Sequence, residues 1–361
     1  MKYIGMFFLA CFLSLPVLAQ EDSTTTDDDE FDFSEFELAA PPAKAYCTNK
    51  VLGQSPTSLI GVFYNQQLPH NLNVGPAANS ILHPEEEVQV ALAQQFSLVS
   101  NFPIISRNNI LINLGVNYQL LDYQIEDPYN HPFTKVLDES TFHRANITAT
   151  LFKPFNEKNF ILAQLQTELN GNYDFNSIDF GKLKFPLAVL YGWKPSDRLM
   201  YAFGLSRTYL GGALNYVPVV YYYHTYKNQK WGVEALLPAR AMLRYRFNSI
   251  SYMGLGFNVN GASFSLKDAV APGVMPAVPS YYDAQDVEWR RSEIRAGLSY
   301  SRQVHGFFWM SAEIGYRINY SFNVDSGGDF VRFFGSDEPY FIENNLANTP
   351  YFTIGLSYVS P

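Results

Sequence analysis

The chain has 361 residues, of which 16% are charged and 16% are aromatic, and its formal net charge is −9. An ordinary soluble domain carries about a quarter charged residues, so this composition favours a protein with one face in apolar surroundings. Two cysteines are too few for a disulfide scaffold, and no basic patch suited to nucleic acid is present.

The first residues have the features of a secretory signal peptide. Lys2 precedes an apolar run that extends to Leu18, and Ala19 supplies the small residue that a signal peptidase requires. We therefore predict a signal peptide over residues 1–19. Cleavage before Cys11, as in a lipoprotein, is an alternative, but it leaves a short apolar stretch.

An acidic segment follows the predicted signal peptide. Residues 20–43 contain nine acidic side chains and no basic one. Such a segment buries too little apolar surface to offset the entropy of ordering, so we predict a disordered acidic periplasmic tail over residues 20–45. Phe31, Phe33 and Phe36 lie between the acids and could dock on a periplasmic partner, whereas a solvated leader is the simpler interpretation.

Beyond the tail, apolar and polar residues alternate with a period of two, which places them on opposite faces of a β-strand. The clearest example has apolar side chains at almost every second position from Phe308 to Phe322, opposite Glu313, Arg317 and other polar or small residues. The alternating stretches are longer than the five or six residues of a typical soluble strand. We predict that the apolar face points outward to lipid and the polar face inward.

The alternation defines a set of strands that can be counted. We predict twelve strands, at residues 57–67, 87–102, 109–123, 140–153, 159–172, 182–193, 198–225, 230–247, 249–266, 286–301, 307–322 and 350–359. Gly211-Gly212, Pro218 and Pro238 interrupt two of them. If each half of these two stretches spans separately, the count becomes fourteen.

The connections alternate between short links and long ones, the rhythm that periplasmic turns and extracellular loops produce in outer-membrane barrels. An even strand count puts both ends of the sheet on the periplasmic side. A sheet in hydrocarbon must also pair every strand, because lipid offers no partner to backbone N–H and C=O groups. We therefore predict an all-β, transmembrane, antiparallel up-and-down β-barrel over residues 46–361.

The chain resembles an uncharacterised family of outer-membrane β-barrel proteins that is classed as a domain of unknown function. The resemblance covers roughly residues 57–359 and rests on the strand rhythm together with a small set of residues. These are Pro218-Val219, Trp231, Leu236-Leu237-Pro238 and Tyr245-Arg246. The resemblance implies a barrel surrounded by outer-membrane lipids, and it implies no activity. Tyr358 would have to serve the barrel assembly machinery as the terminal aromatic signal.

Charged residues recur at positions predicted to face the barrel interior. The candidates for lumen-lining residues are Arg144, Glu168, Arg240, Arg244, Arg246, Glu293, Arg295, Glu313 and Arg317. Two interpretations compete: a narrow wetted pore whose arginines favour anionic solutes, or an interior filled by ion pairs. The presence of both signs favours ion pairing, while the cluster of Arg240, Arg244 and Arg246 on one strand keeps the pore interpretation open.

The leading hypothesis is a narrow porin-like channel or structural barrel without catalysis, metal or cofactor. One alternative is a lipid-active hydrolase centred on His143, which shares a strand face with Thr141. Another is an interaction protein that binds a partner through its surface loops or its acidic tail. The histidines show no metal-site spacing.

Overall fold

The computed structural model describes residues 45–76, 84–127, 131–173, 178–210, 212–267, 287–327 and 340–359. The predicted signal peptide, and the predicted acidic tail up to residue 44, lie outside the described residues. Both therefore stay predictions.

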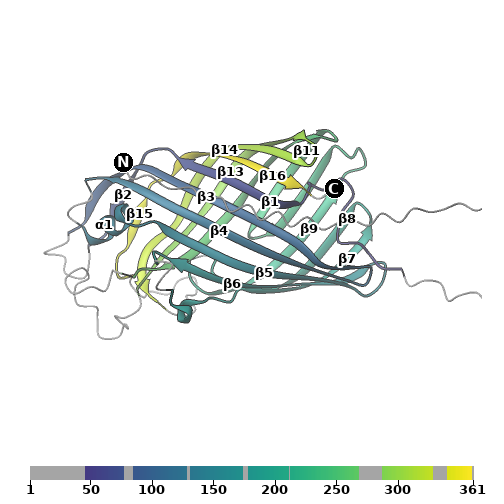
Figure 1. Ribbon diagram of the computed structural model, residues 1–361, viewed down its shortest axis with the longest axis horizontal. Coiled ribbons are helices and arrows are strands. Elements are labelled where there is room, and N and C mark those ends of the chain that lie inside the picture. The colour runs from purple at the N-terminus through teal and green to yellow at the C-terminus, as the bar shows by residue number, and fades with distance from the viewer. Residues whose placement is uncertain are drawn as a thin grey trace, which may run out of the picture. The chain divides into compact units, whose positions relative to one another are not determined.

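Strands make up most of the described chain, with one α-helix and one short 3₁₀ helix between them (Figure 1). The elements are β1 (Ser58–Gln67), β2 (His70–Val74), β3 (Glu86–Arg107), β4 (Ile110–Glu126), α1 (Pro132–Glu139), β5 (Phe142–Pro154), β6 (Asn159–Gly171), η2 (Phe180–Lys182), β7 (Leu187–Ser196), β8 (Leu199–Thr208), β9 (Asn215–Thr225), β10 (Trp231–Leu237), β11 (Arg240–Asn248), β12 (Ser251–Ser265), β13 (Val287–His305), β14 (Phe308–Ser326), β15 (Asn344–Leu346) and β16 (Thr349–Val359).

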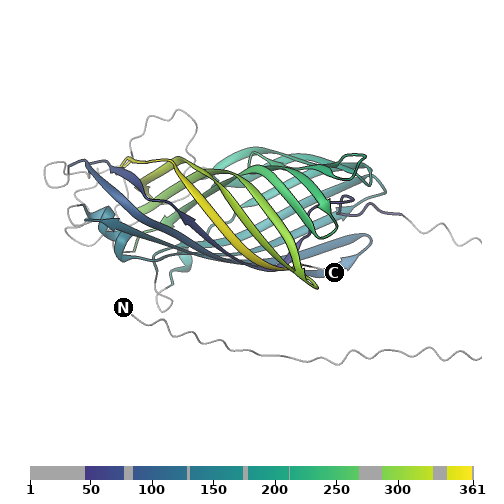
Figure 2. The same cartoon turned by 90° about the horizontal axis from the view of Figure 1, so that it is seen from above.

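Fourteen of the described strands close into one antiparallel barrel (Figures 1 and 2). Closure comes from β1, which pairs with both β16 and β3; Gly61, for example, lies opposite Ser357 on one side and Val99 on the other. The two remaining strands, β2 and β15, lie outside this ring, paired with each other, and β2 also pairs with β3. The predicted antiparallel β-barrel is confirmed.

The count of twelve strands is wrong, and the alternative of fourteen is confirmed. The stretch 198–225 forms β8 and β9, and the stretch 230–247 forms β10 and β11. Gly212 adopts a left-handed φ of +81°, which favours glycine and suits the turn between β8 and β9. Pro238 lies between β10 and β11, where its missing amide hydrogen costs the ladder nothing.

The outer surface of the barrel is apolar. Along β14 the alternate residues from Phe308 to Tyr320 are exposed, while Trp309, Glu313 and Arg317 turn into the interior. Ile314 and Leu205 expose 65% and 66% of their surface. Side chains this apolar, repeated around the ring, form a surface suited to lipid.

A β-bulge changes the face of one predicted outward residue. The register between β13 and β14 shifts because Ser292 pairs with Ser321 while Glu293 pairs with Asn319, which leaves Tyr320 as the extra residue. Phe322 consequently turns inward and is fully buried. The prediction of an outward Phe322 is therefore wrong.

The barrel narrows at the end that carries the long connections. There β6 and β12 lie directly side by side, joined at Gly171 and Ser265, although β7 to β11 separate them elsewhere in the ring. A side chain at Gly171 would meet the backbone oxygen of Ser265 at 2.7 Å, so the close approach requires glycine. At the same level Val324 of β14 bridges to Ile342 beside β15.

The narrowed end is filled by a cluster that we call the loop-end core. At its centre Trp289 lies against five other aromatic side chains. The aromatic members are Tyr123, Phe133, Phe142, Phe264, Trp289 and Phe322, joined by aliphatic residues of β2, β3, β4, α1, β12, β13, β14 and β15. The interior at this end is therefore packed like a soluble core.

Helix α1 contributes to the loop-end core and was not predicted. It follows β4, begins at Pro132 and buries Phe133 and Leu137, which are four residues apart and so share one face. Its Asp138 side chain accepts a hydrogen bond from the Ile125 amide of β4 at 2.8 Å. Eight residues give too few turns for a helical period to show in the sequence. Among the described residues, no helix has the length and apolarity to cross a membrane.

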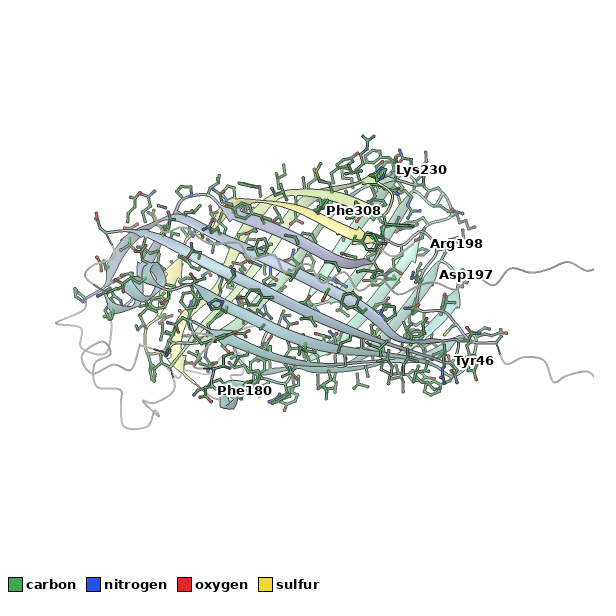
Figure 3. All side chains as sticks on the ribbon, in the orientation of Figure 1. Tyr46, Phe180, Asp197, Arg198, Lys230 and Phe308 are labelled. Carbon is green, nitrogen blue, oxygen red and sulfur yellow. The ribbon has the colours of Figure 1, made fainter. Side chains whose placement is uncertain are left out.

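The two ends of the barrel differ in their connections. The turn end has links of two to five residues between strands, and β1 begins and β16 ends there. Asp197, Arg198 and Lys230 mark these turns (Figure 3). The loop end carries the longer connections, including α1, β2, η2 and β15. The predicted alternation of short and long links thus holds through most of the sheet, with the short β10–β11 turn as an exception.

Removing an aromatic ring from the loop-end core should destabilise the barrel. Phe142 is fully buried, so Phe142→Ala should lower the free energy of unfolding by about 3–5 kcal/mol. Phe180, which is 71% exposed, supplies the matched control, and Phe180→Ala should change it by less than about 0.5 kcal/mol. Urea unfolding in phospholipid vesicles measures both. Equal losses for the two variants would contradict a packed loop-end core.

Candidate functional site

The candidate site is the barrel interior between the loop-end core and the turn end. Inward positions of β5 to β14 bring charged, amide and aromatic side chains into this space, because every second residue of each strand faces it. All nine predicted lumen-lining residues occupy inward positions. They do not form one cluster but three separate groups, with Arg240 and Glu313 apart from these.

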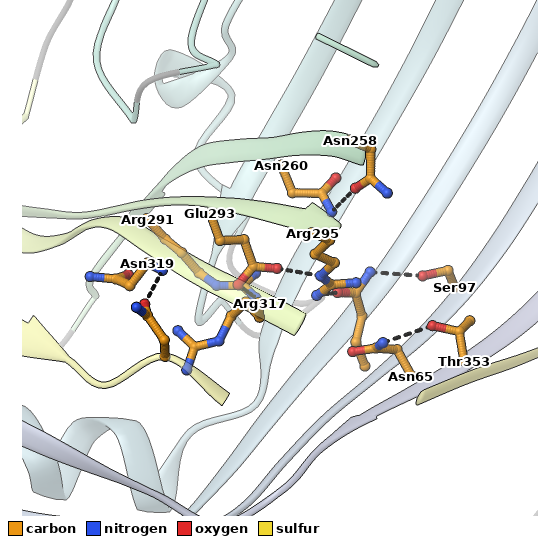
Figure 4. Close-up of polar contacts among 12 residues, drawn as sticks. Asn65, Ser97, Asn258, Asn260, Arg291, Glu293, Arg295, Arg317, Asn319 and Thr353 are labelled. Atoms are coloured by element: carbon orange, nitrogen blue, oxygen red, sulfur yellow. Dashed lines mark hydrogen bonds and ion pairs between the residues drawn. The ribbon is translucent and has the colours of Figure 1, made fainter. Parts of the chain in front are cut away.

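The first group is a polar layer just below the loop-end core, centred on Glu293 (Figure 4). Its carboxylate accepts from Arg291 at 2.8 Å and from Arg295 at 2.5 Å. Arg317 lies close by and donates to the backbone oxygen of Ala347 at 2.6 Å. Charges this deeply buried are tolerated when they are paired and hydrogen-bonded.

Amide side chains extend the polar layer across the lumen. Arg295 donates to Gln95 of β3 at 3.0 Å, and Asn65 of β1 donates to Thr353 of β16 at 2.8 Å. Asn260 donates to Asn258 on β12 at 3.0 Å (Figure 4). The layer therefore links β13 to β3, which are separated in the ring by β14, β16 and β1.

Two further ion pairs line the wall. Arg144 of β5 pairs with Glu168 of β6 at 3.1 Å. Arg244 of β11 pairs with Glu234 of β10 at 2.9 Å and also donates to Thr225 at 3.1 Å. Arg291 and Glu234, which complete two of the three groups, were missed in the sequence; the period-two register of their strands is the signal that could have identified them.

Arg240 and Glu313 have a different environment. Arg240 donates to the Tyr223 hydroxyl at 3.4 Å, and within the described part of the chain no carboxylate lies within ion-pair distance of it. Glu313 accepts a hydrogen bond from the Tyr351 hydroxyl. Arg240 is exposed within the lumen rather than buried.

The turn end is occupied by the N-terminal segment, residues 45–57. Ser55 donates to Glu234 through its backbone amide at 2.8 Å and its hydroxyl at 3.0 Å. Arg246 donates to the backbone oxygens of Gly53 and Gln54 at 3.0 and 3.2 Å. Lys194 binds the backbone oxygen of Lys50 at 2.8 Å. The segment is thus held to the inner wall by charged side chains.

The wall around this segment is apolar on one side, which the sequence interpretation missed. Cys47 and Val51 pack against Phe152, Phe160 and other inward residues of β5 to β9. Burial raises the pKa of the Cys47 thiol above its ordinary value. Period-two alternation could not predict this apolar wall. Where inward and outward residues of a strand are both apolar, the sequence shows no alternation between apolar and polar side chains.

Three cavities lie around these groups. A central cavity of about 540 Å³ is lined by Ser55, Glu234, Arg240 and Glu313 among others. A rim cavity of about 480 Å³ adjoins it at Arg240 and extends toward the β6–β10 side. A turn-end cavity of about 440 Å³ shares residues 54–57 with the central cavity, so the N-terminal segment separates these two.

The rim cavity reaches the outer edge of the wall. Its lining includes Leu187 and Leu237, which point outward and expose 44% and 40% of their surface, and Pro238 in the turn between β10 and β11. The strands β7 to β11 end below the narrowed loop end, where β6 and β12 meet above them. The rim cavity therefore extends to outward-facing residues of the wall near Leu237 and Pro238, and we call this place the side opening.

The residues proposed for a hydrolase, Thr141 and His143, lie just before and at the start of β5. His143 lies on the outward face of β5, and its Nδ1 lies 2.7 Å from the Tyr118 hydroxyl. Its ring also stacks on Tyr118. Thr141 lies outside β5, in an exposed position before the strand begins. In the part of the chain that the structure describes, no group of histidine, cysteine and acidic residues could hold a metal ion.

Comparisons with known proteins place the chain in a family and give low-similarity structural matches. The family model described as "Domain of unknown function (DUF6268)" matches residues 93–359. A search of curated proteins finds no match. The COG4313 outer membrane channel from Pseudomonas putida F1 is 10% identical and has a TM-score of 0.40, covering 85% of this chain and 97% of that one.

Two other solved structures are similar at a comparable level. The KdgM porin in complex with disordered oligogalacturonate is 8% identical with a TM-score of 0.33, covering 83% of this chain and 99% of that chain. A FadL homologue from Pseudomonas aeruginosa is 9% identical with a TM-score of 0.34, covering 83% of this chain and 90% of that chain.

Neutralising the Glu293 carboxylate at the centre of the polar layer should destabilise the barrel. Glu293→Gln leaves Arg291 and Arg295 without their counter-charge, so it should lower the free energy of unfolding by about 3–5 kcal/mol. The control is Glu139→Gln, which removes an exposed pair with Lys135 and should cost less than about 1 kcal/mol. Urea unfolding followed by gel mobility compares the two variants, and a Glu293→Gln barrel as stable as wild type would disprove the paired interior.

Proposed function

We propose that this chain, which belongs to the family described as a domain of unknown function (DUF6268), is an outer-membrane channel for a small solute. The observation that carries the proposal is a closed barrel that has an apolar outer surface and encloses cavities of about 540 and 480 Å³. The solute would move from the side opening through the rim and central cavities to the turn end.

The outer surface supports an outer-membrane location. Apolar side chains such as Ile314, Leu205 and Leu255 are exposed around the ring, and water would make a surface of this size unfavourable. Hydrocarbon also requires that backbone N–H and C=O groups be paired within the protein. Closure of the sheet meets this requirement, because it leaves no unpaired strand edge in the ring. Outer-membrane lipids would contact this surface, and the barrel assembly machinery would insert it.

The route bypasses the loop-end core. That core fills the barrel axis with buried aromatic side chains, so a solute moving along the axis would have to displace them. The side opening near Leu237 avoids this obstacle and joins the rim cavity directly. Loop-end connections face the cell exterior in this orientation, and the turn end faces the periplasm.

The N-terminal segment acts as the periplasmic gate in this proposal. Residues 54–57 lie between the central cavity and the turn-end cavity. Arg246 donates to the Gln54 backbone oxygen and Glu234 accepts hydrogen bonds from Ser55, so these two side chains hold the gate in place. The segment continues into the predicted acidic tail, so a periplasmic partner that binds the tail would have a means of moving the gate.

Loosening the gate should raise conductance. Arg246→Gln removes the hydrogen bonds to Gly53 and Gln54, and a loss of about 1.4 kcal/mol would raise the open fraction roughly tenfold. Planar-bilayer recordings should show low conductance for wild type and an increase of that order for the variant. Maleimide labelling of Cys47, slow in wild type because the thiol is buried, should speed up in parallel.

Lys230→Gln provides the matched control, since Lys230 is exposed in a turn at the same end (Figure 3). It should behave like wild type in both measurements. Bilayers that stay silent with wild type and with Arg246→Gln alike would remove the channel role, even if the labelling of Cys47 changed.

A further inference from the structure

We infer that the rim and central cavities form one binding site for an amphipathic monocarboxylate, with Arg240 holding the carboxylate and the rim cavity holding the apolar body. This inference builds on the proposed channel by naming the class of solute. It rests on the charge of Arg240, on the lining of the rim cavity and on the position where the two cavities meet.

Arg240 is the first element of the site. Arg144 and Arg244 each have a carboxylate partner, and Arg295 shares Glu293 with Arg291. Arg240, by contrast, donates to the neutral Tyr223 hydroxyl at 3.4 Å and is exposed in the lumen. A guanidinium presents parallel N–H groups that match a carboxylate in two-point contact. Arg240 is therefore available to bind an anion.

The position of Arg240 is the second element. It lines both the central cavity and the rim cavity, so a group bound to it can extend into either space. Glu234 and Glu313 line the central cavity and would repel a second negative charge on that side. The rim cavity has the opposite balance, with more arginines than carboxylates. Its charged residues are Arg144, Glu168, Arg207 and Arg240.

The rim cavity supplies the third element, an apolar wall. Leu162, Leu190, Val219 and Leu236 line it from β6, β7, β9 and β10. Next to them the rings of Tyr221 and Tyr223 stack at 4.4 Å with an angle of 12°, leading from the apolar wall to Arg240. A volume of about 480 Å³ is in the range of small-molecule sites, which combine an apolar lining with a few polar groups.

These features together select one ligand class. A carboxylate without an apolar body would leave the leucine and valine wall in contact with water. An apolar molecule without a charge would make no ion pair with Arg240. One charge at one end of an apolar body satisfies all three regions at once.

The test measures binding to the full chain in lipid nanodiscs by calorimetry, with empty nanodiscs as the blank. The probe is hexanoate, compared with acetate, which has the charge without the chain, and with 1-hexanol, which has the chain without the charge. Wild type should bind hexanoate at least tenfold more tightly than either, since each buried methylene adds about fourfold and the charged contact adds a similar or larger factor.

Variants assign the binding to the site. Arg240→Gln should weaken hexanoate at least tenfold, and Arg240→Lys, which keeps the charge but not the two-point contact, should lie between. Leu162→Trp should weaken hexanoate by filling the apolar wall. Arg302→Gln is the control, because Arg302 is exposed on the outer face of β13 and should leave binding unchanged. Heat-modifiable gel mobility confirms that each variant is folded.

The possible results distinguish failure of the binding site from failure of the channel. Acetate or 1-hexanol binding as tightly as hexanoate would overturn the inference using wild type alone, whatever the variants do. Unchanged hexanoate binding in folded Arg240→Gln and Leu162→Trp would also overturn it. Conductance with no hexanoate binding would leave the channel standing and this site refuted, whereas binding without conductance in any variant would support the site and refute the channel.

Discussion

The structure depends on one constraint: a peptide group in hydrocarbon has no hydrogen-bond partner except another peptide group. Pairing of β1 with both β3 and β16 meets this constraint by leaving no free edge in the ring. Closure then fixes the two faces, because alternate side chains must point either to the surroundings or to the lumen. The apolar outer surface and the charged interior are two results of the same closure.

The interior has to resolve a second problem, since charges placed there lose much of their contact with water. Most are paired, and Glu293 between Arg291 and Arg295 is the clearest example. The unequal strand lengths create an exception at Arg240. Because β7 to β11 end below the contact of β6 with β12, the lumen opens sideways beneath a packed core, and Arg240 is left exposed where two cavities meet. The proposed site thus follows from the shape of the sheet.

Sequence alternation was sufficient to predict the barrel and the inward positions of the charged residues, because outward apolar and inward polar side chains contrast along each strand. It failed where that contrast disappears. Phe322 follows a bulge, and Phe152 and Phe160 face an interior that is itself apolar. The sequence also did not show which charged residues form ion pairs. The residues next to Arg240 in the sequence do not indicate that it lacks a carboxylate partner, while Arg244, four residues later, has one.

Lipid contact of the outer surface can be measured directly with brominated phospholipids, which quench tryptophan at close range. Two variants would each keep one tryptophan: Trp231, which is outward and 41% exposed, or Trp289, which is fully buried in the loop-end core. In vesicles we expect strong quenching of Trp231 and little quenching of Trp289. Trp231 fluorescence that is unaffected by brominated lipid but quenched by acrylamide in water would contradict lipid contact of the outer surface.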